Sequence, residues 1–480
     1  MCDDRTVQEV QVEAIPIERL ARLLDDHRGA QFRASADRAR ALLAGRKVWN
    51  INATATGGGV AEMLQSLLAY GRGAGVDTRW LTLDAAPAFF HFTKRLHNRL
   101  HGTAGDGGPV DEGQRTAYEA ALEPNLAQLR TVVRAGDIVL LHDPQTAGLA
   151  GELRQIGARI VWRCHVGRDV PNDHTVAGWS FLRPYVEQAH DVIFSRAVYA
   201  PPWVDADHLW VIPPSLDPFS PKNCGLTEAD VAAALARAGL VDLGDAADNL
   251  EFTRRDGSTG TVRRHTGLVS GGTPAPRDAR IVLQVSRWDH LKDMAGVLRG
   301  FVAVIPRLPA DVHLMLVGPD TSGVTDDPEG AEVLEQCRAL WRAHPVEVRR
   351  RVHLCSLPMD DVDENAHLVN ALQRHASVVV QKSLVEGFGL TVTEPMWKAR
   401  AVVASRVGGI QDQIVHGESG LLLDDPSDLT TFGTLVLAAL TDPGVAERLG
   451  ASARTRVREQ YLGDRHLVQY VTLFEQLLSD

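Results

Sequence analysis

A proline-rich stretch at 211–218 separates two long blocks of sequence, each of which alternates short apolar runs with amphipathic segments. Proline lacks an N–H and fixes φ, so this stretch resists both helix and central strand. In the first block, strand-length runs at 47–52 and 158–166 flank segments of helical period such as 60–75. Alternation of this kind predicts a parallel sheet with helices on both faces. We therefore predict an α/β chain of two Rossmann-like domains that face each other across a cleft.

The 480 residues exceed what one hydrophobic core normally supports, which agrees with two domains. We expect an N-terminal Rossmann-like domain over 1–214, beginning with a helical extension. A C-terminal Rossmann-like domain is expected over 215–456, with an insertion near 242–280 that includes a hairpin over 250–267. The final helix, within 457–480, is expected to pack back toward the N-terminal domain.

Charge and cysteine content exclude several classes of protein. The formal net charge is −11, whereas a non-specific nucleic-acid binder is normally basic. The five cysteines are scattered and contain no C-x-x-C pair, which argues against a disulfide framework and a structural zinc site. No apolar run approaches the roughly 18–20 residues of a membrane helix, and the polar start is unlike a signal peptide. We expect a cytoplasmic protein without nucleic-acid or membrane partners, and a homodimer is left open.

A triple glycine, Gly57, Gly58 and Gly59, follows the first predicted strand and opens the next helix. Glycines there let backbone N–H groups approach a phosphate or a sugar at the positive end of a helix. A tight turn needed only for packing is an equally good interpretation. The spacing is not G-x-G-x-x-G, so it does not indicate a dinucleotide cofactor.

Arg287 and Lys292 follow the first predicted strand of the second block. An Arg fork and a Lys point charge in a loop after a strand could bracket a diphosphate. The alternative is a pair of solvated surface cations.

The segment 386–394, EGFGLTVTE, places two glutamates around a glycine-rich helix start. The backbone amides of Leu390 and Thr391 would face a phosphate at that start. Glu386, in the loop, could accept hydrogen bonds from sugar hydroxyls, and Glu394, expected in the first turn, from a ribose diol. The alternative for Glu394 is structural, because Thr391-x-x-Glu394 is also a capping box.

His165 ends a first-block strand and would face the cleft, although a lone histidine is more often structural. Two D-x-D triplets, 205–207 and 361–363, could hold a divalent ion on a diphosphate. Neither follows a clear buried strand, so we interpret both as solvated loops and predict no metal site.

Taken together, these residues resemble glycosyltransferase family 4, and within it the trehalose glycosyltransferring synthases. The resemblance covers nearly the whole chain, but residues 242–280 are longer than the family's usual connection at that point. Its most telling stretches are 48–62, 89–98, 162–165, 212–218, 285–289 and 386–394. The resemblance implies the GT-B fold, with the acceptor on the first domain and the nucleotide-sugar on the second.

The resemblance also implies roles for the donor-side residues. Arg287 and Lys292 would form the diphosphate clamp, Glu386 would contact the donor sugar, and Glu394 would contact the ribose. Together with His165, the first three of these are the expected catalytic residues.

In the first domain, the resemblance places Gly58 and Gly59 as a backbone floor under the phosphates and sugar. His165 would lie near the transferred sugar. The residues expected on the acceptor side are Lys94, His97 and Asn98.

The implied activity is retaining, metal-independent and reversible synthesis of trehalose from NDP-glucose and glucose, without a further cofactor. The sequence leaves UDP-, ADP- and GDP-glucose open as donors. A retaining trehalose phosphorylase that uses glucose 1-phosphate and a family 4 transferase with another small acceptor are the alternatives. A non-catalytic sugar-nucleotide sensor would not need the complete set of cations and glutamates.

Overall fold

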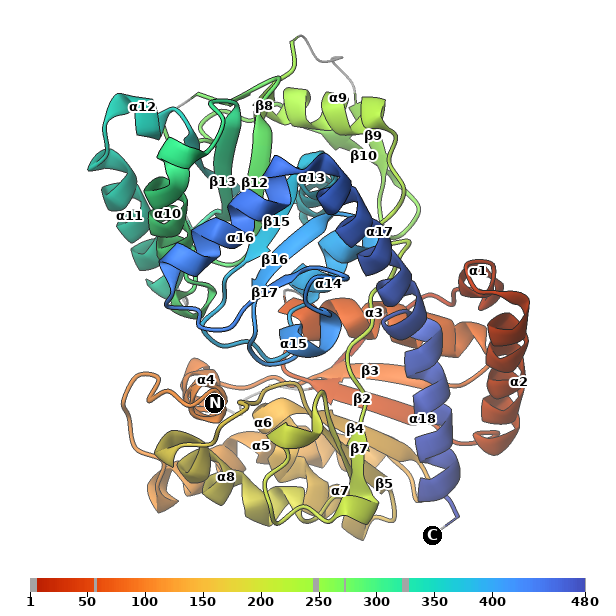
Figure 1. Cartoon of the computed structure of the whole chain (residues 1–480). Coiled ribbons are helices and arrows are strands. Elements are labelled where there is room, and N and C mark those ends of the chain that lie inside the picture. Colours follow the sequence, from red (N-terminus) through yellow and green to blue (C-terminus); the bar gives the residue numbers. More distant parts are fainter. Residues whose placement is uncertain (1–6, 56–57, 245–249, 272, 322–327, 480) are drawn as a thin grey trace. The chain divides into compact units, whose positions relative to one another are not determined.

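The computed structural model forms two compact units (Figure 1). One unit comprises residues 1–216 together with 461–480, and the other comprises residues 217–460. The last helix, α18 (Gly463–Leu477), therefore belongs to the first unit. The residues that the structure describes are 7–55, 58–244, 250–271, 273–321 and 328–479.

The first unit is built on a seven-stranded sheet with the order β1-β3-β2-β4-β5-β6-β7. Every neighbouring pair is parallel except β1 and β3, which are antiparallel. The predicted parallel sheet is thus confirmed, with a short antiparallel strand added at one edge. The strands are β1 (Gln8–Val10), β2 (Val48–Asn52), β3 (Thr78–Thr82), β4 (Ile138–His142), β5 (Arg159–Cys164), β6 (Asp191–Phe194) and β7 (Leu209–Val211).

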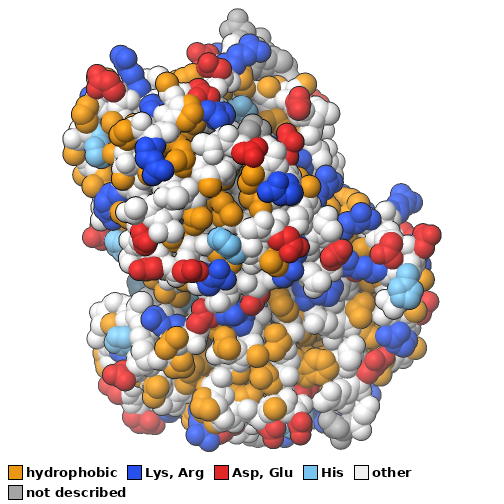
Figure 2. Space-filling model, in the orientation of Figure 1, with side chains coloured by type: hydrophobic (Ala, Val, Ile, Leu, Met, Phe, Trp, Pro, Cys, Tyr) orange, Lys and Arg blue, Asp and Glu red, His pale blue; other side chains and the backbone are white. Residues whose placement is uncertain are grey.

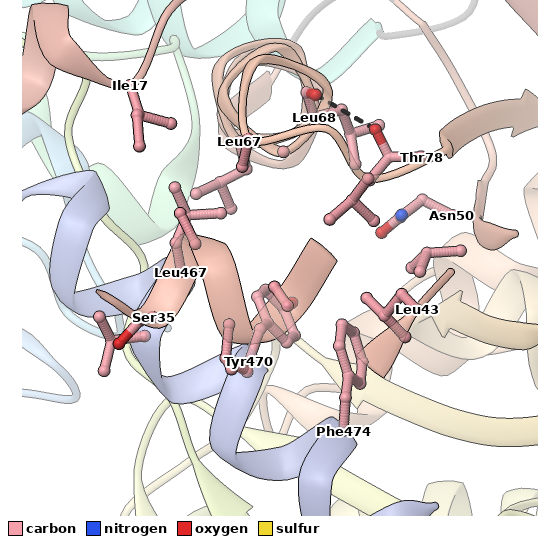
Figure 3. A pocket seen from close by; sticks show the side chains of 18 of the residues that line it. Ile17, Ser35, Leu43, Asn50, Leu67, Leu68, Thr78, Leu467, Tyr470 and Phe474 are labelled. Atoms are coloured by element: carbon pink, nitrogen blue, oxygen red, sulfur yellow. Dashed lines mark hydrogen bonds between the residues drawn. The ribbon is translucent and has the colours of Figure 1, made fainter. Parts of the chain in front are cut away.

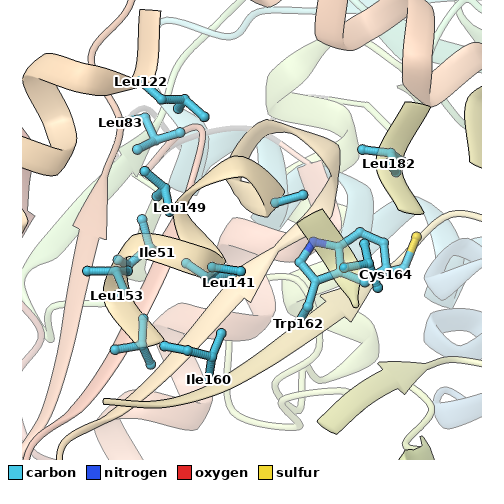
Figure 4. Close-up of a cluster of buried hydrophobic side chains, with 14 of the residues drawn as sticks. Ile51, Leu83, Leu122, Leu141, Leu149, Leu153, Ile160, Trp162, Cys164 and Leu182 are labelled. Carbon is cyan, nitrogen blue, oxygen red and sulfur yellow. The ribbon is translucent and has the colours of Figure 1, made fainter. Parts of the chain in front are cut away.

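Helices cover both faces of this sheet. On one face, side chains such as Ile51, Leu141 and Trp162 point into a core closed by α4 (Pro87–Leu100), α5 (Glu112–Val132), α7 (Ala150–Gln155) and α8 (Asp173–Val186) (Figure 4). The opposite face is covered by α2 (Asp26–Leu42), α3 (Gly58–Gly73) and α18. That second core encloses an apolar cavity of about 80 Å³, lined by residues that include Leu67, Leu467 and Phe474 (Figure 3). A short helix, α1 (Glu18–Ala21), precedes α2.

The second unit is built on a fully parallel six-stranded sheet with the order β14-β13-β12-β15-β16-β17. Helices α10 (Met294–Val304), α11 (Pro328–Arg342) and α16 (Leu429–Thr441) pack on one face, and α9 (Glu228–Ala238) and α13 (Val362–His375) pack on the other. The strands are β12 (Arg280–Val285), β13 (Val312–Pro319), β14 (Val352–Leu357), β15 (Val378–Gln381), β16 (Ala401–Ser405) and β17 (Leu421–Leu423). The other helices are α12 (Val346–Arg349), α14 (Leu390–Trp397), α15 (Ile410–Gln413) and α17 (Pro443–Gln460).

The expected hairpin is present, with β9 (Leu250–Thr253) antiparallel to β10 (Thr259–Val262). A further strand pair joins β8 (Val241–Asp242) to β11 (Ala275–Pro276) in parallel. The expected insertion therefore also contains a short strand at its end.

The face shown in Figure 2 carries acidic and basic side chains interspersed with one another. Within the described ranges, none of the helices combines the length and apolarity of a membrane span; only α16 joined to Gly444–Gln460, across a bend of 99°, passes that test.

Candidate functional site

In each sheet the winding direction reverses at one pair of central strands. In the second unit this point lies between β12 and β15, and in the first unit it lies between β2 and β4. Open α/β sheets bind ligands outside the carboxyl ends of the strands at such a reversal. The loops that follow these four strands are therefore the candidate ligand-binding and catalytic segments.

The two loops of the second unit meet through an ion pair. Lys292 lies in a 3₁₀ turn after β12, and its Nζ is 2.5 Å from Oε2 of Glu386, in the loop after β15. Both side chains are largely buried, with 14% and 11% exposed. The Ser383 hydroxyl donates to the same carboxylate oxygen at 3.3 Å. The structure thus brings together two predicted site residues that are 94 positions apart in the sequence.

A second ion pair, which was not predicted, joins the loop after β12 to the loop after β15. Asp293 follows Lys292 in a left-handed conformation, with φ of 46°, and caps α10 by accepting from the Gly296 amide. Lys382, only 1% exposed, pairs with Asp293 and donates to the Pro426 carbonyl at 2.6 Å. A buried lysine of this kind carries a large desolvation cost, which the paired carboxylate offsets. The pair therefore restrains the loops on either side of Lys292 and Glu386.

Arg287 lies in the same loop as Lys292 and is 54% exposed. One guanidinium nitrogen donates to Asp289 Oδ2 at 2.9 Å, and Asp289 in turn accepts from the Leu291 amide. The side chain is thus tethered at one end of its fork while the rest stays open to solvent. That placement fits a cation that closes on an anionic ligand, and it also fits a surface ion pair.

Helix α14 begins directly after Glu386 and presents uncapped donors. Its N-cap, Gly389, has φ of 88° and no side chain that could accept from the first amides, which belong to Leu390 and Thr391. The Thr391 hydroxyl is buried and has no partner among the described residues. Gln413 holds the turn by donating to the Phe388 carbonyl at 2.6 Å. A helix start with free amides is a site for a phosphate group.

The structure differs from the expected first-turn placement of Glu394 and from the capping-box alternative. Because α14 starts at Leu390, Glu394 lies beyond the first turn, and Gly389 rather than Thr391 is the N-cap, so the capping box does not form. Its side chain is 7% exposed, accepts from Gln373 Nε2 at 3.1 Å, and lies 3.5 Å from the Lys222 ammonium. The carboxylate therefore belongs to a buried polar cluster beneath α14.

Acidic side chains at the start of α13 disfavour the binding of an anion there. Asp361 caps α13, and Asp363 and Glu364 occupy its first turn. The hairpin arginines neutralise them: Arg254 pairs with Asp361 at 2.6 Å and Arg255 pairs with Asp363 at 2.6 Å. The interpretation of 361–363 as a solvated loop was wrong, because β14 precedes it and Asp363 is buried. Asp205 and Asp207, by contrast, are exposed as expected.

No group of three or more metal-ligating side chains occurs among the described residues.

In the first unit, α3 starts at Gly58, so Gly58 and Gly59 form its first two positions after β2. Gly57 lies outside the described residues. The expected strand–glycine–helix order is therefore present from Gly58 onward.

His165 follows β5 and is part of a stacked histidine pair. Its Nε2 is 3.1 Å from Nδ1 of His142, whose Nε2 is 3.1 Å from Oδ1 of Asn50 on β2. The ring centroids of the two histidines are 5.4 Å apart. Burial lowers the pKa of His142 to about 3 and also lowers the pKa of His165, helped by the nearby Arg163 guanidinium. Both rings are therefore neutral at physiological pH and act through hydrogen bonds.

Asp143 is a candidate that the sequence reasoning missed. It follows β4 at the reversal point and has φ of 64°, which is rare for a residue other than glycine. Its Oδ1 accepts from the His165 backbone amide at 2.7 Å. Burial raises the pKa of this carboxyl to about 7, against smaller opposing effects of the amide and of Arg163. An aspartate directly after a buried strand, level with His165, was the signal that could have identified it.

The expected acceptor residues lie on α4, which packs against α6 (Asp143–Thr146). Lys94 is exposed, and Asn98 lies one turn further along the same stripe of the helix. His97 packs its ring edge-on against His101, with centroids 4.9 Å apart. The structure thus places α4 next to the helix that begins with Asp143.

The amino-acid sequence is similar to those of known glycosyltransferases over both units. The family described as "Trehalose synthase, N-terminal domain" matches residues 50–201, and "Glycosyl transferases group 1" matches residues 271–456. The chain is 32% identical over 437 residues to a trehalose synthase of Pyrococcus horikoshii, covering 91% of each chain. It is 34% identical over 443 residues to a trehalose synthase of Rubrobacter xylanophilus, covering 91% of this chain and 92% of that one.

A more distant relative is a trehalose phosphorylase of Pleurotus pulmonarius, 25% identical over 442 residues, with 86% of this chain and 55% of that protein covered. Among solved structures, a UDP-forming α,α-trehalose-phosphate synthase from Burkholderia xenovorans superposes with a TM-score of 0.66 at 14% identity, covering 91% of this chain and 100% of that one. At this identity the likeness shows the fold alone, and it confirms the GT-B class.

Proposed function

Because the chain belongs to the trehalose synthase family of glycosyltransferases, we propose that it makes α,α-1,1-linked trehalose from a nucleotide-glucose and free glucose. The reaction is reversible and retains the configuration at the donor's anomeric carbon. The observation that carries the proposal is the cluster at the second reversal point, where Lys292 and Glu386 meet beside the uncapped start of α14.

The donor diphosphate is assigned to the loop after β12 and to the start of α14. Lys292 gives one N–H to Glu386, and its remaining ammonium N–H groups are available to a phosphate. Arg287 adds a flexible fork, and the amides of Leu390 and Thr391 add fixed dipoles. Negative charge grows on the leaving phosphate as the glycosidic bond breaks, and donors aimed at that charge lower the barrier most.

The sugars are assigned to carboxyl groups at the two reversal points. Glu386 accepts hydrogen bonds from hydroxyls of the donor glucose. Asp143, beside His165, holds a hydroxyl of the acceptor glucose, and α4 with Lys94, His97 and Asn98 borders the same sugar. The neutral ring of His165 contacts the transferred glucose.

No metal ion and no further cofactor are required in this scheme. Divalent ions in metal-dependent transferases neutralise the diphosphate, and here Arg287, Lys292 and the α14 amides take that role. The carboxylates of 361–363, which could otherwise hold such an ion, are paired with hairpin arginines.

The test is incubation of the purified chain with glucose and UDP-, ADP- or GDP-glucose in the presence of EDTA. NMR should show α,α-trehalose and free nucleoside diphosphate from at least one donor. Lys292→Ala should lower kcat by roughly 10²-fold or more. Arg307→Ala is the control, an exposed cation just before β13, at the amino ends of the strands, whereas Lys292 lies at their carboxyl ends. Absence of trehalose with every donor would refute the proposal.

A second candidate, a phosphorylase that uses glucose 1-phosphate, is favoured by one observation. Glu394 already has one oxygen held by Gln373 and an ion-pair partner in Lys222, so its charge is compensated without a ribose. Trehalose formed from glucose 1-phosphate and glucose, but from none of the nucleotide-glucoses, would select this candidate.

A further inference from the structure

Lys398 lies in the buried cluster beneath α14, immediately after the last residue of that helix. It is 4% exposed, and its ammonium donates to Gln373 Oε1 at 2.7 Å, to Asn223 Oδ1 at 2.9 Å and to the Glu394 carbonyl at 3.3 Å. Burial lowers the pKa of Lys398 to about 7, and below that pH its ammonium has three N–H donors and no acceptor. All of its hydrogen-bonding capacity is therefore used inside the protein, and none is left for a ligand.

The donor-only character of Lys398 decides how Gln373 is oriented. Gln373 is fully buried on α13, and its amide oxygen must face the ammonium. Its NH₂ group then points the other way and donates to Glu394 Oε2 at 3.1 Å. Without the ammonium, the amide could rotate and turn its oxygen toward the carboxylate, which would be repulsive.

The hydrogen bonds from Lys398 to Gln373 and from Gln373 to Glu394, called the relay below, leave Oε1 of Glu394 available to a ligand. Within the described part of the chain, the contact recorded for Oε1 is the Lys222 ammonium at 3.5 Å. That distance exceeds the 2.7–3.2 Å of a normal N–H···O bond. Glu394 therefore has one oxygen fixed by the protein and one oxygen that can accept from a ligand hydroxyl.

We propose that Lys398 and Gln373 are positioning residues that hold the Glu394 carboxylate in the orientation that accepts the ribose diol of the donor. The inference rests on the proposed function, in which the donor is a nucleotide-sugar. Neither residue touches the substrate: Lys398 acts through Gln373, and Gln373 acts through Glu394.

The experiment compares the affinities of UDP, ADP or GDP with those of the matching 2′,3′-dideoxynucleoside diphosphates, measured by calorimetry on the full chain. The wild-type protein should bind the ribose form at least about tenfold more tightly, because a hydrogen bond to a charged group is strong. Lys398→Met and Gln373→Met should each reduce this ratio to within about threefold. Affinity for the dideoxy form should change by less than about threefold.

Asn370→Leu is the matched control for a loss of packing. Asn370 is buried on the same helix and donates to the Pro221 and Cys224 carbonyls, and its recorded contacts do not include Glu394. It should keep the wild-type ratio even if its melting temperature falls. If Lys398→Met fails to fold, Gln373→Met still tests the proposal, because it breaks the same relay without removing a charge.

The KM values give an independent readout. In both relay variants the KM for nucleotide-glucose should rise while the KM for glucose stays within twofold, a split that a general loss of stability would not produce. Relay variants that retain the wild-type ribose preference would overturn the positioning role. A wild-type protein without any ribose preference would instead overturn the contact between Glu394 and ribose, and with it the nucleotide donor.

Discussion

Gly389→Ala offers a sharp test of the site at the start of α14. Gly389 has φ of 88°, and a Cβ there would lie 3.1 Å from Glu386 Cγ and 3.1 Å from Ile410 Cγ1. The left-handed conformation alone costs an alanine about 1–2 kcal/mol. Carbon atoms prefer separations of about 3.5–4.0 Å, so Glu386 must also move by a few tenths of an ångström. Because even small misplacements of a positioning group are costly, we expect kcat/KM to fall by about tenfold.

Gly417→Ala separates the two effects. Gly417 lies in the same unit with φ of 80°, and a Cβ there would meet no atom within 4 Å. Both variants should lose about 1–2 kcal/mol of unfolding free energy, measured by urea denaturation at 25 °C. Only Gly389→Ala should lose activity in the steady-state assay of nucleotide-glucose turnover. Equal activity in the two alanine variants would refute the assignment of Glu386 to the sugar.

Three further predictions concern other parts of the chain. The folded-state pKa of Asp143 lies above its unfolded value, so the stability due to its protonated form is complete below about pH 4 and is lost as pH rises through about 7. Relative to Asp143→Asn, the unfolding free energy of the wild-type protein from urea titrations should fall by on the order of 3 kcal/mol over that range, and a constant difference would contradict the burial effect. Ala39→Leu should fill the apolar cavity of the first unit and raise the unfolding free energy by about 1–2 kcal/mol, measured by thermal unfolding. Ala30→Leu, at an exposed position on the same helix, should change it little in the same measurement. Arg263→Ala should lower the unfolding free energy by about 2 kcal/mol in urea denaturation, because it removes a cation from the buried Glu364 carboxylate. A loss below about 0.5 kcal/mol would contradict this role of Arg263.

The strands were predictable because their signal is local. The apolar runs 138–141 and 281–283 are continuous, and such a run is typical of a strand buried on both faces. The edge strand at Gln8–Val10 was missed because it is only three residues long and largely polar, and it pairs with β3, far along the chain. A pairing of this kind leaves little trace in the sequence.

The start of α14 was predicted near Leu390, but local reasoning left the capping box open as an alternative. The pattern Thr391-x-x-Glu394 has the composition of a capping box, but a cap forms only where the backbone enters the helix. That point is set by Gly389 in the left-handed region and by Gln413, which binds the Phe388 carbonyl from 25 positions away. The residue types were compatible with either start, and a distant side chain decided between them.

The charged clusters could not be predicted for the same reason, because their members are far apart in the sequence. Arg254 and Asp361 are separated by 107 positions, so the aspartate could be judged only from its immediate neighbours, which are polar. The significance of Asp143 depends on its φ angle and on burial against β5, and neither is visible in the letters H-D-P. By contrast, Lys292 and Glu386 were predicted as site residues from their motifs alone, although their contact required the structure.

The pairing of Lys292 with Glu386 also bears on the mechanism by which the proposed reaction would retain configuration. A retaining glycosidase uses a carboxylate as nucleophile beneath the anomeric carbon, which requires that carboxylate to be free to attack. Glu386 instead shares its Oε2 between the Lys292 ammonium and the Ser383 hydroxyl, and both interactions withdraw electron density from it. Asp143, the other carboxyl at a reversal point, carries a proton in about half of the molecules near pH 7. Neither group is suited to form a glycosyl–enzyme bond, so we expect front-face transfer, in which the leaving phosphate oxygen accepts the proton of the incoming hydroxyl. Trapping with a 2-fluoro-glucosyl nucleotide followed by intact-protein mass spectrometry should therefore show no glucosylated chain, and a covalent adduct on either carboxylate would refute this mechanism.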